Sequence, residues 1–539
     1  ESMKVSQGQY DVQRLVDREA TSSYYTNLDG VEVVRALLSQ LPGQSRENVV
    51  LADPFMGSGV LLTAVDDLVK PSKVVGFEIN EAPCSLGRRL VAEAYPGAEV
   101  EVYCGDAFEL GWRYAGQVDL IVTNPPFVRW SRLPREYRER LLGRFEAGGY
   151  GKYVSRRDPG LHVLGLMLAD HMLREGGLLI SVVPASAFYT EQGRGLKELL
   201  RERYEVLAIA KNERGPSFSD GSGFEELIVM ARKGRGGSAT SLYRLSSALE
   251  RLGEVGLASL PRLADRNWLS LFKPGALELA RALEELARSG ALRYLRRDEV
   301  VRGVEMYGPD FFFVPNKYWS IAREADGAVV LRNRLTGDEV ELPRRYLVPC
   351  LRRPGAYRAP IVEDPGHYAL SVPRGDRIEG GLKEYVNWGV ASGAASPAVK
   401  AFGREWLSHV WRQLRARSPF GGVFVRDKLD LSRDEVVAYY SPRPICATKD
   451  FHVIRGGGQL LATWYNSSAF RAVLAAFGRD ISGAWTRLVE GDLLAIPVPS
   501  VKAEDDPAAL MALLGVVEGA ARSPPAARGA GGGAARPAR

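Results

Sequence analysis

Residues 119–130 read DLIVTNPPFVRW, and they join an apolar strand to a rigid polar corner. Proline is poorly tolerated inside a central strand, so two prolines in succession end the strand and fix the loop that follows. The side-chain oxygen of Asn124 and the carbonyl oxygen of Pro125 could then direct two acceptors at one amino group. Phe127 could stack on the flat ring that carries this amino group. A turn with Phe127 in the core is the structural alternative.

Apolar strands alternate with helical patterns on both sides of this stretch. This alternation predicts an α/β fold with a mostly parallel sheet covered by helices on both faces. The last two strands are joined by about a dozen residues without a helical pattern, so we expect that pair to be antiparallel. The seven expected strands cover residues 48–53, 73–79, 100–106, 117–127, 176–188, 204–212 and 225–233.

The length of 539 residues exceeds the size at which one core stops growing, so at least two domains are expected. The Gly/Ser-rich segment GRGGSAT, residues 234–240, is typical of a linker. We therefore expect a first domain over residues 1–240 and a second domain, of mixed α+β type, over residues 241–520. The low-complexity tail, residues 521–539, is expected to be disordered.

Composition and charge exclude several classes of protein. No apolar run of about 18 or more residues occurs, so no membrane span is expected. The four cysteines form no C-x-x-C pair and the five histidines show no metal-binding spacing, so we expect no metal site and no disulfide framework. The N-terminal residues lack the apolar core of a signal peptide, which favours the cytoplasm. The net charge of +6 is compatible with nucleic-acid binding.

The ends of the first three expected strands carry residues suited to binding a nucleoside. DPFMGSG, residues 53–59, contains two glycines that let a ligand approach the backbone, but it lacks the third glycine of a dinucleotide site and the lysine of a P-loop. Glu78 could bind ribose hydroxyls. Asp106 could accept from an adenine amino group, although it could equally be a helix N-cap. A plain strand–helix turn is the alternative for the glycines.

Taken together, these strand ends resemble the gamma class of S-adenosylmethionine-dependent adenine-N6 DNA methyltransferases, in which the cofactor segments precede N-P-P-Y/F and a DNA-reading domain follows. The resemblance covers residues 20–235 and includes GGLLISVVPASAF, residues 176–188. It implies a Rossmann-like methyltransferase domain, with residues 20–40 forming a helical segment at the cofactor. By the family pattern the cofactor contacts are Tyr25, Thr26, Asp53, Pro54, Gly57, Gly59, Glu78, Asp106 and Phe108.

By the same pattern Asn124 and Pro125 would bond the target N6, with Pro126 and Phe127 completing the catalytic tetrapeptide. Phe127 and Phe218 would stack on the target base, and Phe224 competes with Phe218 for that role. The implied reaction is direct methyl transfer from S-adenosylmethionine to the N6 of an adenine flipped out of double-stranded DNA, without a metal or a covalent intermediate. A restriction–modification or protection system is the expected context.

Three other functions stay open at this stage. They are RNA guanine-N2 methylation, methylation of a glutamine side chain in a release factor, and a DNA-binding specificity subunit with an inert methyltransferase half. No nuclease motif stands out and no domain precedes the methyltransferase, so we expect modification without cleavage by this chain. A separate restriction endonuclease is a possible partner.

Arginine-rich segments are the candidates for contacts with DNA. The loop after the tetrapeptide is either a phosphate clamp or a solvated helix paired with its own glutamates. In the second half, residues 460–500 resemble the end of target-recognition domains. The candidate DNA contacts are Arg129, Arg132, Arg344, Arg345, Arg352, Arg353, Arg412, Arg415 and Arg417.

Overall fold

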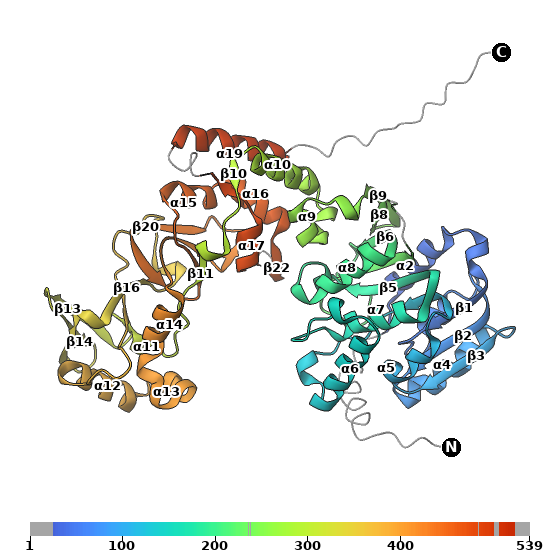
Figure 1. The fold of residues 1–539 in the computed structure, drawn as a ribbon, viewed down its shortest axis with the longest axis horizontal. Coiled ribbons are helices and arrows are strands. Elements are labelled where there is room, and N and C mark those ends of the chain that lie inside the picture. Colours follow the sequence, from blue (N-terminus) through green and yellow to red (C-terminus); the bar gives the residue numbers. More distant parts are fainter. Residues whose placement is uncertain (1–24, 235–236, 238, 483–484, 501–505, 523–539) are drawn as a thin grey trace, which may run out of the picture. The chain divides into compact units, whose positions relative to one another are not determined.

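The structure is a computed structural model, and it describes residues 25–234, 237, 239–482, 485–500 and 506–522. The chain divides into two compact units, each described here by itself (Figure 1). The first unit comprises residues 1–260 and 265–272, and the second comprises residues 261–264 and 273–539. Among the described residues, no helix is both long enough and apolar enough to cross a membrane.

A nine-stranded sheet forms the centre of the first unit, in the order β3-β2-β1-β4-β5-β7-β6-β8-β9. The seven expected strands are confirmed, and β6 and β7 are antiparallel, as predicted. β7 is also antiparallel to β5, its other neighbour. Two further strands, β8 and β9, extend the sheet beyond β6. The strands are β1 (Glu47–Asp53), β2 (Lys70–Glu78), β3 (Glu99–Cys104), β4 (Val118–Thr123), β5 (Leu173–Pro184), β6 (Tyr204–Asn212), β7 (Glu226–Lys233), β8 (Thr240–Leu245) and β9 (Leu249–Val255).

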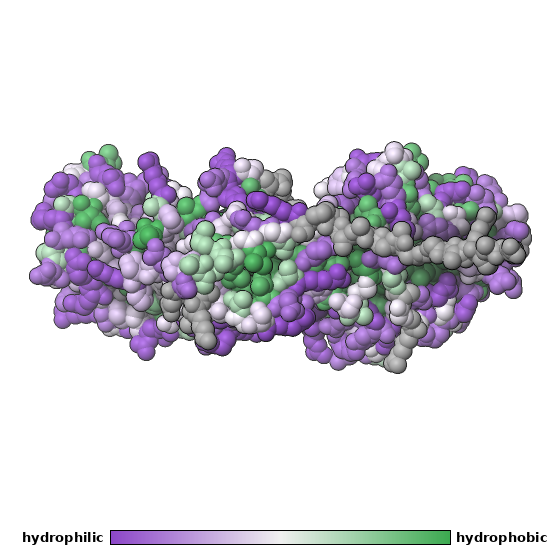
Figure 2. All heavy atoms as spheres, turned by 90° about the horizontal axis from the view of Figure 1, so that it is seen from above, coloured by the Kyte–Doolittle hydropathy of each residue, from purple (hydrophilic) through white to green (hydrophobic). Residues whose placement is uncertain are grey.

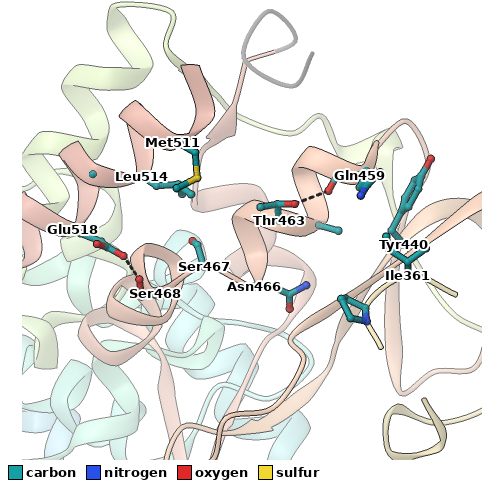
Figure 3. A pocket seen from close by; sticks show the side chains of 13 residues that line it. Ile361, Tyr440, Gln459, Thr463, Asn466, Ser467, Ser468, Met511, Leu514 and Glu518 are labelled. Atoms are coloured by element: carbon teal, nitrogen blue, oxygen red, sulfur yellow. Dashed lines mark hydrogen bonds between the residues drawn. The ribbon is translucent and has the colours of Figure 1, made fainter. Parts of the chain in front are cut away.

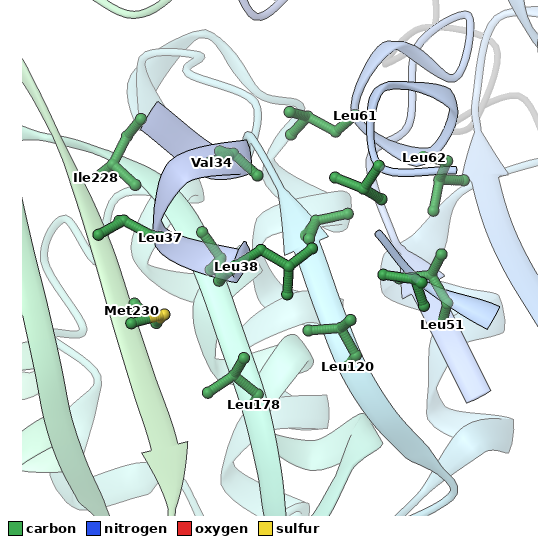
Figure 4. Packing of buried hydrophobic residues seen from close by; sticks show 14 of the residues in the cluster. Val34, Leu37, Leu38, Leu51, Leu61, Leu62, Leu120, Leu178, Ile228 and Met230 are labelled. Atoms are coloured by element: carbon green, nitrogen blue, oxygen red, sulfur yellow. The ribbon is translucent and has the colours of Figure 1, made fainter. Parts of the chain in front are cut away.

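Helices cover this sheet because their apolar stripes match the apolar strands. Val34, Leu37 and Leu38 of the first described helix form one core with Leu120 and Leu178 of the sheet (Figure 4). Another helix, over residues 161–172, is buried on almost every side, which explains its largely apolar sequence. The helices are α2 (Leu28–Ser39), α3 (Val60–Ala64), α4 (Glu81–Ala94), α5 (Ala107–Leu110), α6 (Arg135–Ala147), α7 (Leu161–Met172) and α8 (Arg194–Arg203).

The expected helical segment at residues 20–40 corresponds to α2, and its residues 20–24 lie outside the described part of the chain. Asn27 caps this helix by accepting a hydrogen bond from the backbone N–H of Gly30. The residues just before it pair with a distant loop, since Thr26 forms a β-bridge with Ser219. The chain entry to α2 is thereby fixed against residues 217–220.

The division between the units differs from the expected boundary at residue 240. Thr240 begins β8, which pairs in parallel with β6, so the sheet runs on past the glycine-rich segment. Trp268 stacks on Phe188 of the first unit, with 5.3 Å between ring centroids. Glycine content alone indicated a linker, but the alternating apolar residues of TSLYRL, residues 240–245, continue the sheet instead.

All four cysteines are paired, contrary to the expectation of no disulfide framework. Cys84 of α4 is bonded to Cys104 at the end of β3, with a Cα–Cα distance of 5.6 Å. Cys350 and Cys446 face each other on adjacent strands, with a Cα–Cα distance of 4.5 Å. The sequence separations of 20 and 96 residues gave no sign of these pairs, because each arises from neighbouring elements in the fold.

The second unit contains four small sheets, which agrees with the expected mixed α+β domain. The largest has seven strands in the order β11-β21-β18-β20-β16-β17-β12, and the others are β13-β14-β15, β19-β23-β22 and β10-β24. These strands are β10 (Leu292–Arg293), β11 (Val300–Arg302), β12 (Phe313–Val314), β13 (Trp319–Glu324), β14 (Ala328–Asn333), β15 (Glu339–Pro343), β16 (Leu347–Leu351), β17 (Tyr368–Leu370), β18 (Phe420–Arg426), β19 (Lys428–Asp430), β20 (Ala438–Ala447), β21 (Phe451–Ile454), β22 (Arg479–Ser482), β23 (Trp485–Arg487) and β24 (Val498–Pro499).

Short helices surround these sheets. The helix α9 (Arg262–Arg266) lies at the division between the units. The others are α10 (Ala276–Arg288), α11 (Pro309–Phe312), α12 (Gly380–Ser392), α13 (Ser396–Phe402), α14 (His409–Arg417), α15 (Gln459–Tyr465), α16 (Ser468–Phe477), α17 (Glu490–Ala495) and α19 (Pro507–Arg522).

The last described helix, α19, packs with one face only. Leu510, Leu513, Leu514 and Val517 are buried at helical spacing, against α10 and α16. Seen from above, hydrophobic side chains gather over this helix on a surface that is otherwise largely hydrophilic (Figure 2). The expected tail begins within α19, at residues 521–522, and its residues 523–539 lie outside the described part of the chain.

A pocket of about 500 Å³ lies between α15, α16, α19 and β20 in the second unit (Figure 3). Its lining is mixed, with Met511 and Leu514 on one side and Gln459 and Asn466 on the other. The Thr463 hydroxyl donates to the carbonyl oxygen of Gln459, and the Ser468 hydroxyl donates to Glu518. Neither Asn124 nor the glycine turn at residues 57–59 lines this pocket.

Candidate active site

The candidate site lies where the strand order of the sheet reverses. β1 and β4 are parallel neighbours, and the chain leaves them toward opposite edges of the sheet. In open α/β sheets ligands bind beyond the carboxyl ends of the strands at such a point. Asp53 ends β1 and Asn124 follows β4, so the fold brings the glycine turn and the NPPF tetrapeptide together.

A buried carboxyl group links the two strand ends. The Thr123 hydroxyl donates to Oδ1 of Asp53 over 2.6 Å, and the backbone N–H of Phe55 donates to the same oxygen over 3.0 Å. Burial raises the pKa of Asp53 to about 7, although both hydrogen bonds act to lower it. Asp53 therefore holds the two loops in register rather than presenting an exposed charge.

The NPPF corner is rigid for a reason that involves α7 as well as the prolines. Gly165 of α7 lies so close that an added Cβ would be 3.1 Å from Cβ of Pro125 and 3.0 Å from the Phe55 ring. Real Cβ atoms rarely come so near their neighbours. The helix therefore packs tightly against the NPPF corner, and the Asn124 side chain is only 7% exposed.

The amide group of Asn124 is held by two hydroxyl groups. Its Nδ2 donates to Oγ of Ser219 over 2.8 Å and to Oγ1 of Thr26 over 3.3 Å. Ser219 in turn donates to the carboxylate of Glu226 over 3.0 Å. With both amide hydrogens engaged, Oδ1 of Asn124 is the atom left to accept a hydrogen bond. Within the described part of the chain no donor to this oxygen is found.

The glycine turn forms a second cluster with Tyr25 and Glu78. Gly57 has φ of +57°, and a Cβ there would lie 3.0 Å from the Tyr25 ring. Burial and the nearby Glu78 carboxylate raise the pKa of Tyr25, which a hydrogen bond with Ser58 lowers in part. Gly59, with φ of +85°, is the N-cap residue of α3. The structure therefore brings together Tyr25, the turn and Glu78.

Asp106 occupies the position that its helix-cap alternative predicted. Its side chain accepts from the backbone N–H of Phe108 over 2.9 Å and so caps α5. The Tyr137 hydroxyl donates to its other oxygen over 2.6 Å. Burial raises the pKa of Asp106 to about 6, against the lowering effect of both hydrogen bonds. The Phe108 ring packs 5.3 Å from that of Phe55, which places Asp106 beside the glycine turn.

Three rings meet at the NPPF corner, and Phe218 is not one of them. The Phe127 ring lies 4.8 Å from that of Phe224 and 5.5 Å from that of His162. Phe224 is 37% exposed, whereas Phe218 is 0% exposed and belongs to the core beneath α2. The structure does not support the expectation that Phe218 stacks on a base, because its ring has no accessible face.

The loop after the tetrapeptide combines exposed arginines with buried aromatic rings. Arg129 and Arg132 are exposed, in agreement with a contact surface. Trp130, Tyr137 and Tyr153, in contrast, are buried and pack within the first unit. Three arginines of the loop pair with carboxylates on or beside α6, as in the solvated-helix alternative. These pairs are Arg135–Glu139, Arg140–Glu109 and Arg156–Glu146.

The seven candidate arginines of the second unit fall into two groups. Arg345, Arg353 and Arg415 are exposed. The other four are partly buried and bonded inside the unit: Arg344 to the Ala325 carbonyl, Arg352 to Asp310, Arg412 to the Glu405 carbonyl and Arg417 to Gln413. Arginines whose donors already have internal partners have fewer donors left for phosphates.

Three residues at the site were not found from the sequence. Ser219 and Glu226 hold Asn124, and His162 lies beside Phe127 with its Nε2 buried and without a hydrogen-bond partner among the described residues. Burial lowers the pKa of His162 to about 4, so it is neutral at pH 7. Their only local signal is a polar residue next to an apolar run, as in EELIVMARK, residues 225–233.

The nine-stranded sheet and the polar strand ends define the fold of the first unit, which is that of the Rossmann-like methyltransferases. Residues 12–148 match the family model described as N-6 DNA Methylase. This match includes the glycine turn, Glu78, Asp106 and the NPPF tetrapeptide. Residues 12–148 are therefore similar to the N-6 DNA methylase family over about the first quarter of the chain.

Solved structures resemble the chain at low sequence identity. The Type IIL restriction–modification enzyme MmeI, solved in complex with DNA, is 11% identical with a TM-score of 0.50, covering 95% of this chain and 73% of that one. The type IIG restriction endonuclease BpuSI is 15% identical with a TM-score of 0.44, covering 95% of this chain and 62% of that one. A modification subunit of a putative type I restriction enzyme from Vibrio vulnificus is 16% identical, with a TM-score of 0.34. This match covers 46% of this chain and 54% of that one. The chain thus spans less than two thirds of the latter two proteins.

Proposed function

We propose that this protein transfers a methyl group from S-adenosylmethionine to the N6 amino group of an adenine in double-stranded DNA, within a restriction–modification or protection system. The observation that carries the proposal is the fixed amide of Asn124. Its Nδ2 is bound to Ser219 and Thr26, so its Oδ1 and the adjacent Pro125 carbonyl are the acceptors left for an amine. The match of residues 12–148 to the N-6 DNA Methylase model supports the same substrate.

The residues of the glycine turn fit S-adenosylmethionine. A Cβ at Gly57 would crowd the Tyr25 ring, so the turn leaves space beside its backbone only because residue 57 is a glycine. Glu78 stands at the end of β2, where it would accept from ribose hydroxyls, and Asp106 at the end of β3, where it would accept from the adenine amino group. The buried Oδ1 of Asn80, which has no hydrogen-bond partner in the described chain, adds an acceptor next to Glu78.

S-adenosylmethionine would supply a methyl group on a positively charged sulfur, which is already an electrophile. The chain then has to position an amine and stabilise the charge that develops on it. Oδ1 of Asn124 and the Pro125 carbonyl accept the two N6 hydrogens and direct the nitrogen lone pair away from the ring. These bonds strengthen as the nitrogen bonds to the methyl carbon, the carbon–sulfur bond breaks and the nitrogen becomes positively charged. One N6 proton would then pass to water.

The aromatic rings at the corner would hold the base outside the duplex. Phe127 and Phe224 offer faces for stacking, and stacking of a base on an aromatic side chain contributes about 1–3 kcal/mol. That gain offsets the few kcal/mol that unstacking the adenine costs. A base held in this way has its amino group beside Asn124.

The second unit would read the DNA sequence, with Arg345, Arg353 and Arg415 of that unit and Arg129 and Arg132 of the first as exposed contacts. The structure of MmeI, which aligns with 95% of this chain, was solved in complex with DNA. A restriction endonuclease on a separate chain remains part of this proposal, as does assignment to the gamma class.

The test is to incubate the purified protein with methyl-labelled S-adenosylmethionine and, in separate reactions, duplex DNA, transfer RNA and a release factor. We expect label only in DNA, and only at N6-methyladenine after digestion to nucleosides. Label in guanine of RNA would support the RNA enzyme, and label in protein would support the glutamine enzyme. Binding of DNA without any transfer would support a specificity subunit, and each of these results would overturn the proposal.

A pH dependence of cofactor binding follows from Asp106. Burial raises its pKa to about 6, and only the ionised carboxylate keeps acceptors for both its internal donors and an adenine amino group. The affinity for S-adenosylmethionine should therefore be full above pH 7 and fall as the pH decreases through about 6, by up to about tenfold per pH unit. Calorimetric titrations between pH 5 and pH 8 measure this. In Asp106→Asn the decrease should disappear, and an unchanged pH profile in that variant would contradict the assignment.

Phe224 is expected to be the second stacking ring. Phe224→Ala should lower kcat/KM for DNA by about 10- to 100-fold, because one stacking contact is lost, while the affinity for S-adenosylmethionine stays the same. Leu86→Ala, which removes an exposed apolar side chain from α4 in the same unit, is the matched control. If both variants methylate DNA like the wild type, Phe224 has no role in holding the base.

A further inference from the structure

The side chain of Asn124 has two possible orientations, and only one of them suits an amine substrate. With Oδ1 toward the substrate it accepts from N6, whereas a flipped amide would present N–H groups to other N–H groups. Which orientation is stable depends on the groups behind the amide. These groups are Ser219 and Thr26, and Ser219 is bound to Glu226.

Glu226 determines which atoms donate and which accept in the hydrogen bonds that join Glu226, Ser219 and Asn124. A carboxylate can only accept, so the single hydroxyl proton of Ser219 is taken by Oε2 over 3.0 Å. Ser219 then has only lone pairs to offer Asn124, and its partner over 2.8 Å must be the Nδ2 donor. The other carboxylate oxygen, Oε1, accepts from the backbone N–H of Phe218 over 2.9 Å, which keeps Glu226 in place.

We propose that Ser219 and Glu226 are positioning residues that fix the amide of Asn124 with its oxygen toward the methyl-accepting amine. This inference rests on the proposed function and adds a mechanism for the correct orientation of Asn124. Ser219 is 4% and Glu226 3% exposed, so water does not compete for these bonds. Nothing in the mechanism places either residue in contact with a substrate.

Backbone hydrogen bonds hold the segment that contains Thr26 against the segment that contains Ser219. Thr26 and Ser219 form a β-bridge, the N–H of Asn27 donates to the Phe218 carbonyl over 2.9 Å, and the N–H of Asp220 donates to the Tyr25 carbonyl over 2.8 Å. The segment that contributes Tyr25 to the cofactor cluster is therefore tied to the segment that orients Asn124.

Glu226→Gln is the decisive variant because it keeps the shape of the side chain but replaces a hydrogen-bond acceptor by a donor. A glutamine can donate to Ser219, which frees the serine proton for Oδ1 of Asn124 and favours the flipped amide. We expect kcat to fall about 100-fold, with KM for DNA and S-adenosylmethionine changed less than about threefold. Ser219→Ala removes the acceptor without reversing the bonds, and Thr26 remains, so a smaller decrease of about tenfold is expected.

A double-mutant cycle separates this effect from a general loss of structure. In an Asn124→Ala background, Glu226→Gln should cause no further decrease in kcat, since no amide is left to orient. Equal decreases in both backgrounds, or a change confined to KM, would overturn the proposal. Glu225→Gln, at the neighbouring position before β7, is the matched control and should keep wild-type kcat.

Thermal unfolding of the same four full-length proteins distinguishes failure of this inference from failure of the proposed function. If the wild type methylates no substrate, the proposed function fails. The coupling between Asn124 and Glu226 in unfolding free energy still reports whether the hydrogen-bonded chain exists. Additive effects on stability would overturn the inference whatever the activity.

Discussion

Asn124→Ala should lose methyl transfer to DNA by about 1,000-fold in kcat while keeping its affinity for S-adenosylmethionine. The variant removes an acceptor whose bond to the amine strengthens in the transition state, and loss of one such preorganised contact costs about 10²–10³-fold. The Asn124 side chain is bonded to Ser219 and Thr26 rather than to the Tyr25 ring or the glycine turn, so cofactor binding should change less than about threefold.

The measurement is single-turnover transfer of labelled methyl groups to duplex DNA, together with a calorimetric titration of the cofactor. Gln117→Ala, an exposed amide just before β4 in the same unit, is the matched control and should keep full activity. Full transfer by Asn124→Ala would show that the acceptors of the NPPF corner do not carry the reaction. Loss of cofactor binding as well would show that the corner has a structural role instead.

Gly57→Val should abolish measurable cofactor binding, with a decrease in affinity of at least about 100-fold, or ~2.7 kcal/mol. Two costs add at this position. A φ of +57° is unfavourable for a β-branched residue, and the new Cβ would lie 3.0 Å from the Tyr25 ring. The Tyr25 ring would have to move, and with it the space beside the turn.

Gly116→Val separates the two costs. Gly116 has φ of +64° but nothing within 4 Å of an added Cβ, so it suffers the backbone strain without the crowding. Both variants should lower the melting temperature, Gly57→Val at least as much as Gly116→Val, and only Gly57→Val should lose S-adenosylmethionine in equilibrium dialysis. Normal binding by Gly57→Val would remove the glycine turn from the cofactor site.

Much of the first unit could be predicted because its signals are local. Each strand of β1 to β7 is an apolar run ended by glycine, proline or a charged residue, and these features act within a few positions of the chain. The NPPF corner and the glycine turn were found for the same reason. Their meeting at the ends of β1 and β4 follows from the parallel topology alone.

The remaining features depend on contacts between distant segments. Phe218 and Phe224 are equivalent candidates in the sequence, and only the pairing of residues 25–27 with residues 217–220 decides that Phe218 is buried. Similarly, the sequence allowed two roles for Asp106, a contact with adenine or a helix N-cap. The structure shows that it caps α5 and also accepts a hydrogen bond from Tyr137 of α6. Which of the candidate arginines are partly buried depends on carbonyl and carboxylate groups that other segments of the chain bring close to them.

The extension of the sheet by β8 and β9 affects how chimeric proteins should be built. A junction at the glycine-rich segment, residues 234–240, would leave the parallel edge of β6 bare, and bare edges template aggregation. It would also separate Trp268 from the Phe188 ring on which it stacks. Exchange of the second unit between relatives should therefore be spliced after Phe272, with the first protein supplying everything before that point.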